Sequence, residues 1–197
     1  MPPKSRFSAE DIIEVAFNIV RWNGWEALSA RAVAEELNSS TMPVYFHFKS
    51  MENLEEEVIK KALALLLDYQ SRIITGDLLL DFGVGYVSFS REEQHLFKGI
   101  NDRKYSHLLT KHGQMNFDFL INALAGDERF RRYSQEELRN IMIVLWVFIH
   151  GLAQLRNSLP QERLEGIELT EFLKTASSIF VKGLDAGLDQ DKTALSF

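Results

Sequence analysis

The chain has 197 residues, of which 46% are apolar and 25% charged, and its formal net charge is −6. These values are those of an ordinary globular protein. The absence of cysteine from the sequence excludes disulfides, thiolate metal sites and cysteine nucleophiles. The N-terminus turns acidic before any apolar run, and the longest apolar run, Ile141–Ile149, is far shorter than the roughly 20 residues of a membrane span. We expect a cytoplasmic protein that does not enter the membrane.

Apolar residues recur at helical spacing along nearly the whole chain, and no convincing two-residue alternation occurs, so the expected fold class is all-α. The expected helices, in chain order, span about residues 9–23, 30–37, 40–46, 51–75, 78–89, a short segment after 93, 102–125, 135–158 and 168–187. Asp189–Phe197 is expected to be a loose tail.

Polar residues mark the starts and stops of the first three helices. Ser8 with Asp11 predicts one helix start, and Ser29 predicts the next. Asn38 tolerates the left-handed conformation that leaves a helix in a sharp turn. Pro43 then falls in the first turn of the third helix, where proline is tolerated because the N–H groups there have no intrahelical partner.

Two capping boxes are expected further along the chain. They are Ser90 with Glu93 and Ser134 with Glu137, and the second would open the most hydrophobic helix, which Pro160 closes.

The first three helices predict a helix-turn-helix, whose second helix enters the major groove of DNA. Residues 1–50 would form this DNA-binding domain, the helix of about 51–75 would connect it, and residues 76–197 would form a larger helical-bundle domain for effector binding and dimerisation. Helical spacing alone is weak evidence, because many small helical units share it.

The order of residues is more specific. The run FSAEDIIEVAFNIVRWNGWEALSARAVAEEL, followed by SSTMPVYFHFKSMENL with its Tyr-x-His-Phe-x-Ser element, resembles the N-terminal domain of TetR/AcrR-family transcriptional regulators. WVFIHGLAQL, from Trp146 to Leu155, resembles a helix common in the C-terminal domain of that family. The resemblance implies a homodimeric, non-enzymatic regulator, most often a repressor, that binds a palindromic double-stranded operator and is released by a small, mostly apolar effector.

The expected DNA contacts combine hydrogen-bonding side chains around the third helix with nearby cations. Tyr45 and His47 would contact phosphates as in the family, while Phe46 and Phe48 would pack beneath them. The full set is Lys4, Arg6, Arg31, Ser39, Ser40, Thr41, Met42, Pro43, Tyr45, His47 and Lys49. Met51 stands where the family usually has a phosphate-binding lysine, which predicts modest and salt-dependent affinity.

The C-terminal domain is expected to hold an effector pocket lined by aromatics with a few polar groups. The candidate pocket residues are Phe82, Tyr86, Phe89, Arg103, Asn116, Phe117, Trp146, His150 and Gln154. Each aromatic also fits a plain core role, and His150 also fits a hydrogen-bonded core histidine.

The last two helices present faces that can form a four-helix bundle with a second copy. The candidate dimer residues are Leu145, Phe148, Leu152, Leu169, Phe172, Leu173, Ala176, Ile179, Phe180 and Gly183, some of which would face their own core.

No cofactor or metal site and no catalytic residues are expected, since Glu92-x-x-His95 lacks the second copy that a carboxylate-bridged metal site needs. The alternatives are a helical small-molecule binder and a protein-interaction module, both without DNA function.

Overall fold

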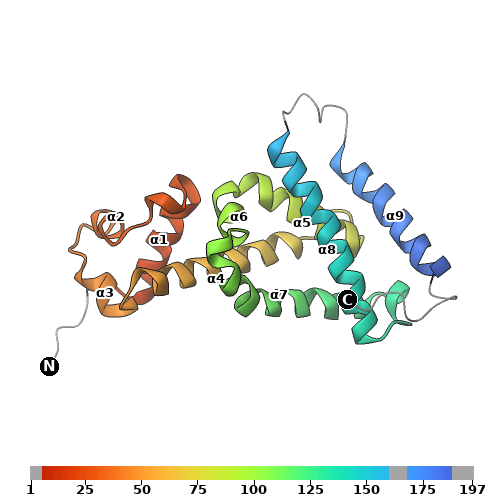
Figure 1. The fold of residues 1–197 in the computed structure, drawn as a ribbon, viewed down its shortest axis with the longest axis horizontal. Coiled ribbons are helices and arrows are strands. Elements are labelled where there is room, and N and C mark those ends of the chain that lie inside the picture. Colours follow the sequence, from red (N-terminus) through yellow and green to blue (C-terminus); the bar gives the residue numbers. More distant parts are fainter. Residues whose placement is uncertain (1–5, 160–167, 188–197) are drawn as a thin grey trace. The chain divides into compact units, whose positions relative to one another are not determined.

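A computed structural model describes residues 6–159 and 168–187, and every regular element in these ranges is helical (Figure 1). The all-α prediction is therefore confirmed. Lys4, Pro160 and Asp189–Phe197 lie outside the described residues. The α-helices are α1 (Ala9–Asn23), α2 (Ala30–Glu36), α3 (Met42–Phe48), α4 (Met51–Gln70), α5 (Leu78–Glu92), α6 (Gln94–Ile100), α7 (Ser106–Gly126), α8 (Gln135–Ser158) and α9 (Leu169–Gly187). Short 3₁₀ helices are η1 (Trp25–Ala27), η2 (Arg103–Tyr105) and η3 (Glu128–Phe130).

Several predicted helix starts are confirmed by their hydrogen bonds. Ser8 and Asp11 form the expected capping box at α1, in which the Asp11 N–H donates to Ser8 Oγ at 3.1 Å. Ser29 accepts from the Ala32 N–H at α2. Ser134 and Glu137 form the second confirmed box, at α8. Each cap satisfies a backbone donor that has no partner inside its helix, which is why these helices begin where the sequence indicates.

The capping box predicted at Ser90 and Glu93 is wrong. Ser90 lies inside α5, where its hydroxyl donates to the Val87 carbonyl at 2.8 Å. Glu93 is buried, and its carboxylate accepts from Arg21 Nε at 2.7 Å instead of capping α6. A charged guanidinium satisfies this buried carboxylate better than one backbone N–H would, so the long-range ion pair prevails over the local motif.

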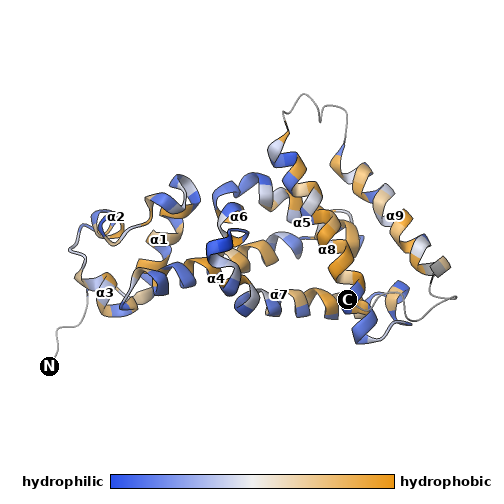
Figure 2. Cartoon of the chain, in the orientation of Figure 1, coloured by the Kyte–Doolittle hydropathy of each residue, from blue (hydrophilic) through white to orange (hydrophobic). Residues whose placement is uncertain are grey.

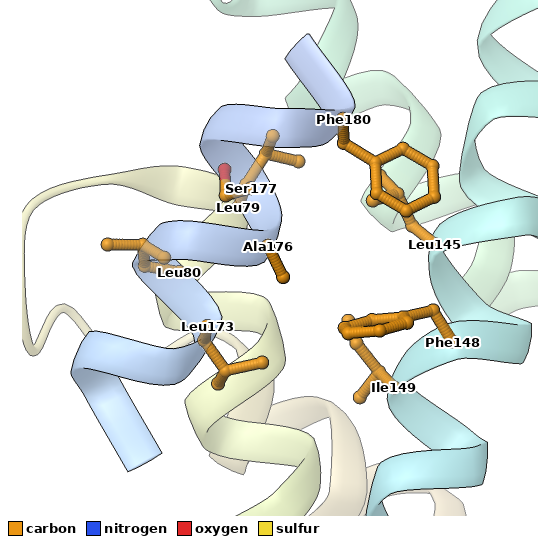
Figure 3. Close-up of a pocket in the computed structure, with 9 residues that line it drawn as sticks. All are labelled: Leu79, Leu80, Leu145, Phe148, Ile149, Leu173, Ala176, Ser177 and Phe180. Atoms are coloured by element: carbon orange, nitrogen blue, oxygen red, sulfur yellow. The ribbon is translucent and has the colours of Figure 1, made fainter. Parts of the chain in front are cut away.

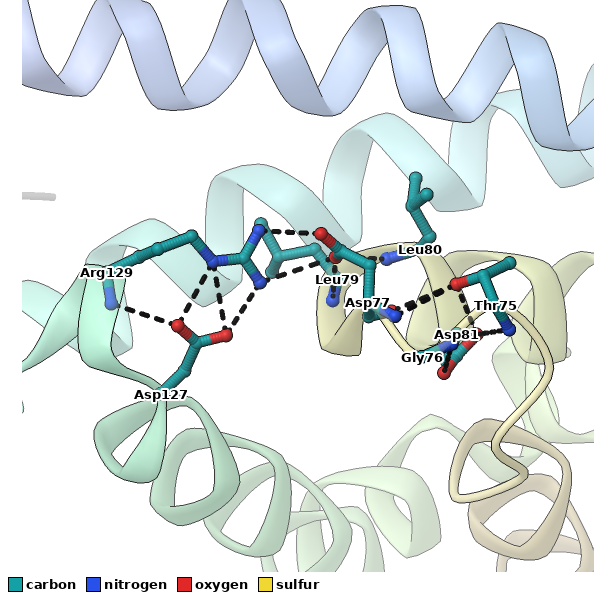
Figure 4. A network of polar contacts seen from close by, with 8 residues as sticks. All are labelled: Thr75, Gly76, Asp77, Leu79, Leu80, Asp81, Asp127 and Arg129. Carbon is teal, nitrogen blue, oxygen red and sulfur yellow. Dashed lines mark hydrogen bonds and ion pairs between the residues drawn. The ribbon is translucent and has the colours of Figure 1, made fainter.

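Helix α4 ends at Gln70, five residues before the predicted end. The carboxylate of Asp81, which is buried in α5, accepts from the Thr75 N–H at 2.7 Å and from the Gly76 N–H at 3.2 Å (Figure 4). Gly76 has φ +80°, a left-handed conformation that glycine adopts without strain. These bonds hold the segment after α4 in a non-helical path, which local spacing does not predict.

The described chain divides into two compact units that do not follow chain order. One holds residues up to Leu65 together with Glu93–Gln114, and the other holds Leu66–Glu92 and the residues from Met115 onward. Helices α4 and α7 thus contribute residues to both units.

In the first unit, α1 to α3 and the first part of α4 bury an aliphatic core that includes Ile12, Val20, Val33, Val44 and Leu54, all with no exposed surface.

Helix α6 completes this first unit by packing on α1 and η1. The Trp25 indole N–H donates to the His95 carbonyl at 2.9 Å, and the Trp25 ring lies 4.7 Å from the Tyr105 ring between centroids. A Cβ on Gly99 would overlap the Trp25 ring, so only glycine fits at this contact. Residues 93–114 are therefore an integral part of the unit that carries the helix-turn-helix.

The second unit is built around α5, which packs on α8 and α9. Figure 2 shows the hydrophobic band along the middle of α8. By length and composition α8 could cross a membrane, but a core helix meets the same criterion, and here Leu138, Ile141 and Met142 are buried in the core of this unit.

An arginine joins two turns in this second unit. Arg129 Nη1 donates to Asp77 at 2.7 Å, and Arg129 Nη2 donates to Asp127 at 2.6 Å (Figure 4). Asp77 Oδ1 also accepts from the Leu79 and Leu80 N–H groups at the start of α5.

Candidate nucleic-acid interface

The turn between α2 and α3 has the hydrogen bonds of a Schellman motif. The Ser39 N–H donates to the Ala34 carbonyl at 2.9 Å, and the Asn38 N–H donates to the Glu35 carbonyl at 3.1 Å. Asn38 has φ +47°, which confirms the left-handed exit predicted from its side chain. This turn fixes the direction in which the chain leaves α2, because it satisfies two carbonyls in the last turn of that helix, those of Ala34 and Glu35.

Helix α3 begins at Met42, two residues later than predicted, because Ser39 is used in the turn that ends α2. Thr41 occupies the N-cap position without a side-chain cap bond, and Ser40 Oγ lies 3.4 Å from the Met42 N–H that donates to it. Pro43 lies in the first turn, as predicted. Its ring restricts φ at the start of the helix and takes away no intrahelical bond.

The two sides of α3 differ sharply in exposure. Val44 and Phe48 point into the core, with 0% and 7% of their surface exposed. Met42, Tyr45 and Phe46 are 72%, 48% and 61% exposed. The expectation that Phe48 packs beneath the helix is confirmed, whereas the same expectation for Phe46 is wrong, because helical spacing places Phe46 one turn from Met42 on the outer face.

His47 connects α3 to the N-terminal arm. Its Nε2 lies 2.9 Å from the Phe7 carbonyl, and because a carbonyl only accepts, Nε2 carries the proton in this bond. The neighbouring Arg6 is exposed, and its guanidinium lies 5.5 Å from the centre of the Phe7 ring. His47 thereby holds the start of the described chain beside α3, a role that its family-type motif does not reveal.

The other predicted contact residues lie around α3 with different local partners. Arg31, exposed on α2, pairs with Glu35 at 2.9 Å. Lys49 is exposed directly after α3 at φ +62°, and no ion pair to it occurs among residues 6–159 and 168–187. Met51 is half-buried in the first turn of α4, so a thioether occupies the position where the family usually has a cation.

Ion pairs in this unit also connect α4 to η2 and to the first part of α7. The Glu56 carboxylate accepts from Lys111 Nζ at 2.8 Å and lies 2.7 Å from His112 Nε2. The hydrogen bond from Lys111, followed by that from His112, lowers the pKa of Glu56 to about 2. Lys104 makes a parallel bond to Glu55 at 2.7 Å. These acidic residues of α4 are thus matched by cations within their own unit.

The predicted effector-pocket residues divide into several groups. Phe82, Tyr86 and Phe89 are buried on α5, and Phe117 packs against the same core as Phe82. Asn116 is half-buried, while Arg103 is exposed in η2 and belongs to the other compact unit.

Four of the predicted pocket residues come together on α5 and α8. The Tyr86 hydroxyl lies 2.9 Å from His150 Nδ1, and the Trp146 ring stacks on the His150 ring at 5.4 Å between centroids. The Gln154 amide lies 3.4 Å from His150 Nε2. Burial lowers the pKa of His150, so the imidazole is neutral near pH 7 and can both donate and accept.

A small apolar cavity lies between α5, α8 and α9 and was not anticipated as a cavity (Figure 3). Phe148 and Ile149 of α8 face Leu173 and Ala176 of α9 across it. Its volume is about 20 Å³, room for about one water molecule. The complete lining is Leu79, Leu80, Leu145, Phe148, Ile149, Leu173, Ala176, Ser177 and Phe180.

Half of the predicted dimer residues therefore line a cavity within their own protomer. Those on the cavity are Leu145, Phe148, Leu173, Ala176 and Phe180. Leu152 and Leu169 pack against the neighbouring small core, and the Phe148 ring stacks on that of Phe172 at 6.3 Å. Phe172, Ile179 and Gly183 are exposed on α9. Helical spacing does not separate the residues that face the protomer's own core from those that face outward, so the dimer interface stays a prediction.

Helices α1 to α3 with their tight turn, joined to a larger helical bundle, define a helix-turn-helix DNA-binding protein. Residues 12–58 match the family model described as bacterial regulatory proteins, tetR family. The N-terminal domain is therefore of the kind found in TetR-family transcriptional regulators, which bind DNA.

Solved structures show that the fold likeness extends over most of the chain. A protein of unknown function from Rhodococcus sp. RHA1 has a TM-score of 0.68 at 18% identity, covering 93% of this chain and 98% of its own. A transcriptional regulator from the same organism has a TM-score of 0.64 at 18% identity, covering 90% and 97%. A Rhodococcus sp. protein provisionally assigned to the TetR family of transcriptional regulators has a TM-score of 0.61 at 15% identity, covering 87% and 97%. No curated protein matches the sequence.

Proposed function

We propose that the protein is a cytoplasmic, homodimeric repressor that binds a palindromic operator and leaves it when a small, mostly apolar effector binds. Each protomer would place α3 in the major groove, at half-sites roughly 34–36 Å apart. The observation that carries this proposal is the outer face of α3, which stays exposed while Val44 and Phe48 anchor the helix in the core. Arg6, Arg31 and Lys49, and Lys4 beyond the described residues, would contact phosphates.

The dimer is supported by exposed apolar side chains on α8 and α9. Trp146, Val147 and Leu155 on α8 and Phe172 and Ile179 on α9 are all at least 39% exposed. Gly151 and Gly183 leave open space on these helices, which lets a second helix approach closely. We expect the outer sides of α8 and α9 to pair with the same helices of a second copy.

This dimer predicts that Ile179→Glu shifts the protein to monomers in light scattering at micromolar concentration, with unchanged helicity by circular dichroism. Glu171→Gln, an exposed change on the same helix, is the matched control. A monomeric wild-type protein under these conditions would contradict the proposal.

The effector site is proposed in the second unit, where the apolar cavity lies. Effector pockets typically exceed about 300 Å³, so the cavity of about 20 Å³ would have to widen as α8 and α9 adjust. Tyr86 and His150 are the polar groups that we expect to orient the effector, because His150 is neutral and only half-buried. Release from DNA requires the effector to bind one conformation more tightly, typically by about 1–3 kcal/mol. Helix α4 would carry this change to the helix-turn-helix.

The proposed effector role of His150 is tested by His150→Phe, which removes the hydrogen-bonding groups but keeps an aromatic ring. We expect the variant to bind operator normally and to need more effector for release, measured by titrating each candidate compound into the complex. An unchanged response would remove His150 from the site.

The proposed function is tested by selecting bound DNA from a random pool, followed by footprinting on the gene's own upstream region. We expect a protected palindrome. A helical small-molecule binder or a protein-interaction module would enrich no sequence, which separates the alternatives. Tyr45→Phe should weaken binding of the selected operator, because it removes only the hydroxyl proposed to reach a phosphate.

A further inference from the structure

The outer face of α3 is largely apolar although it is exposed. Met42 and Phe46 are 72% and 61% exposed and lie one helical turn apart, so their side chains cover neighbouring parts of the same face. Tyr45 lies beside them at 48% exposure. Large apolar side chains as exposed as these contribute little to the stability of this unit, since Val44 and Phe48 already fill the core beneath them.

The same helix lacks the side chains that usually distinguish bases by hydrogen bonds. Arginine or lysine reads guanine, and asparagine or glutamine reads adenine, each through two parallel bonds. The segment Met42–Phe48 is MPVYFHF and contains none of these. His47 already has its Nε2 within 2.9 Å of the Phe7 carbonyl. The hydroxyls of Ser40, Thr41 and Tyr45 remain, and they fit phosphates as well as bases.

The major groove offers one apolar group that such a face can recognise, the C5-methyl of thymine. Cations stand beside the apolar face: Lys49 follows α3 directly, and Arg6 is held close by the bond between His47 and Phe7. The major groove has phosphates along its edges and thymine methyl groups on its floor. The cations suit the phosphates, and the apolar side chains between them suit the methyl groups.

We propose that Met42 and Phe46 recognise thymine methyl groups, so that each operator half-site has thymines at the positions that α3 covers. This inference rests on the proposed operator binding and specifies how the operator is read. Loss of one contacted methyl should weaken binding about fourfold, which corresponds to about 0.8 kcal/mol. The same loss in both half-sites of a palindrome should weaken binding about 15-fold.

The experiment uses the full-length protein and the operator recovered from the random pool. Each thymine of a half-site is replaced in turn by deoxyuridine, which removes the methyl and keeps every hydrogen-bonding group. Affinity is measured by fluorescence anisotropy at one fixed salt concentration. We expect a fourfold loss at one or more adjacent central positions of the half-site and none at thymines outside the protected region.

Protein variants assign the effect to the two side chains. Phe46→Ala and Met42→Ala should each bind the thymine operator more weakly and lose most of the difference between thymine and deoxyuridine. Trp22→Ala is the matched control, because Trp22 is an aromatic 68% exposed in the same unit but lies on α1. Helicity and urea unfolding of all three variants should match the wild type, since the replaced side chains lie at the surface.

The results distinguish a failure of methyl recognition from a failure of the proposed operator binding. If no DNA is enriched, the proposed function fails and this inference fails with it. If an operator is enriched but deoxyuridine is tolerated at every position, or if both alanine variants still prefer thymine as strongly as the wild type, DNA binding stands and methyl recognition is refuted.

Discussion

Replacing Gly85 by alanine tests the close packing of α5 against the end of α4 in the second unit. A Cβ on Gly85 would lie 2.6 Å from the carbonyl carbon of Tyr69 and 2.7 Å from the Cα of Gln70. The obstacle is the backbone of α4, which cannot rotate away, so the two helices would have to separate by about 1 Å to restore van der Waals contact. Separation would also weaken the hydrogen bond from the Tyr69 hydroxyl to Glu92 at 2.7 Å.

The expected net cost follows from two opposing effects. Alanine is favoured over glycine inside a helix by about 1 kcal/mol. Overpacking against rigid backbone costs about 1–3 kcal/mol, and weakening the partly buried hydrogen bond adds up to about 1 kcal/mol. We therefore expect Gly85→Ala to lower the free energy of unfolding by about 1–3 kcal/mol.

The assay is urea unfolding followed by circular dichroism, at one protein concentration because dimerisation would add to the stability. Gly126→Ala is the matched control, since Gly126 lies in α7 with no atom within 4 Å of the added Cβ. Because Gly126 is the last residue of α7, the control should be as stable as the wild type or more stable by up to about 1 kcal/mol. A Gly85→Ala protein as stable as this control would refute the close approach of α4 and α5.

Three further predictions follow from the ion pairs and cations. Glu56→Gln should flatten the pH dependence of stability. The pKa of Glu56 is lowered from 4.5 to about 2, so its ionised form stabilises the fold above pH 4.5 and this stability is lost as the pH falls from 4.5 to about 2. Urea unfolding at a series of pH values should show the wild type losing more stability than the variant over this range. Arg129→Met should lower the free energy of unfolding by about 1 kcal/mol, because it leaves Asp77 and Asp127 without their shared cation. The control Arg139→Met breaks an exposed pair with Asp118 and should lower it by less than about 0.5 kcal/mol in the same assay. Lys49→Gln should reduce the slope of log affinity against log salt by about 2 per dimer in gel shifts, since each protomer loses one phosphate contact, and an unchanged slope would place Lys49 away from the backbone.

The sequence predicted most accurately those features that nearby residues determine. Ser8, Ser29 and Ser134 cap helices through bonds that span three residues, and Asn38 leaves α2 in the left-handed conformation that its side chain permits. These interactions are local, so the order of residues is sufficient to predict them. The same locality explains why the position of Pro43 in the first turn of α3 was predicted correctly.

Features that depend on distant partners could not be predicted in this way. Glu93 serves Arg21, 72 residues away, and Asp81 captures the backbone after α4. At the candidate DNA-binding surface, nothing in the local pattern distinguishes Phe46 from Phe48, which differ only in the direction that the register of α3 gives them. The role of His47 depends on Phe7, whose carbonyl approaches only once the arm has folded back.

The unit that carries the helix-turn-helix is completed by residues 93–114, and this limits how its operator preference can be transferred to another regulator. A chimera cut after α4 would lose the Glu93 carboxylate that pairs with Arg21 and the His95 carbonyl that binds Trp25. The Arg21 guanidinium and the Trp25 indole would then lie against residues of the other regulator that do not provide these hydrogen-bond acceptors. Exchanging only the exposed residues of α3, Met42, Tyr45 and Phe46, would transfer the proposed DNA-contacting surface and leave these long-range partners in place.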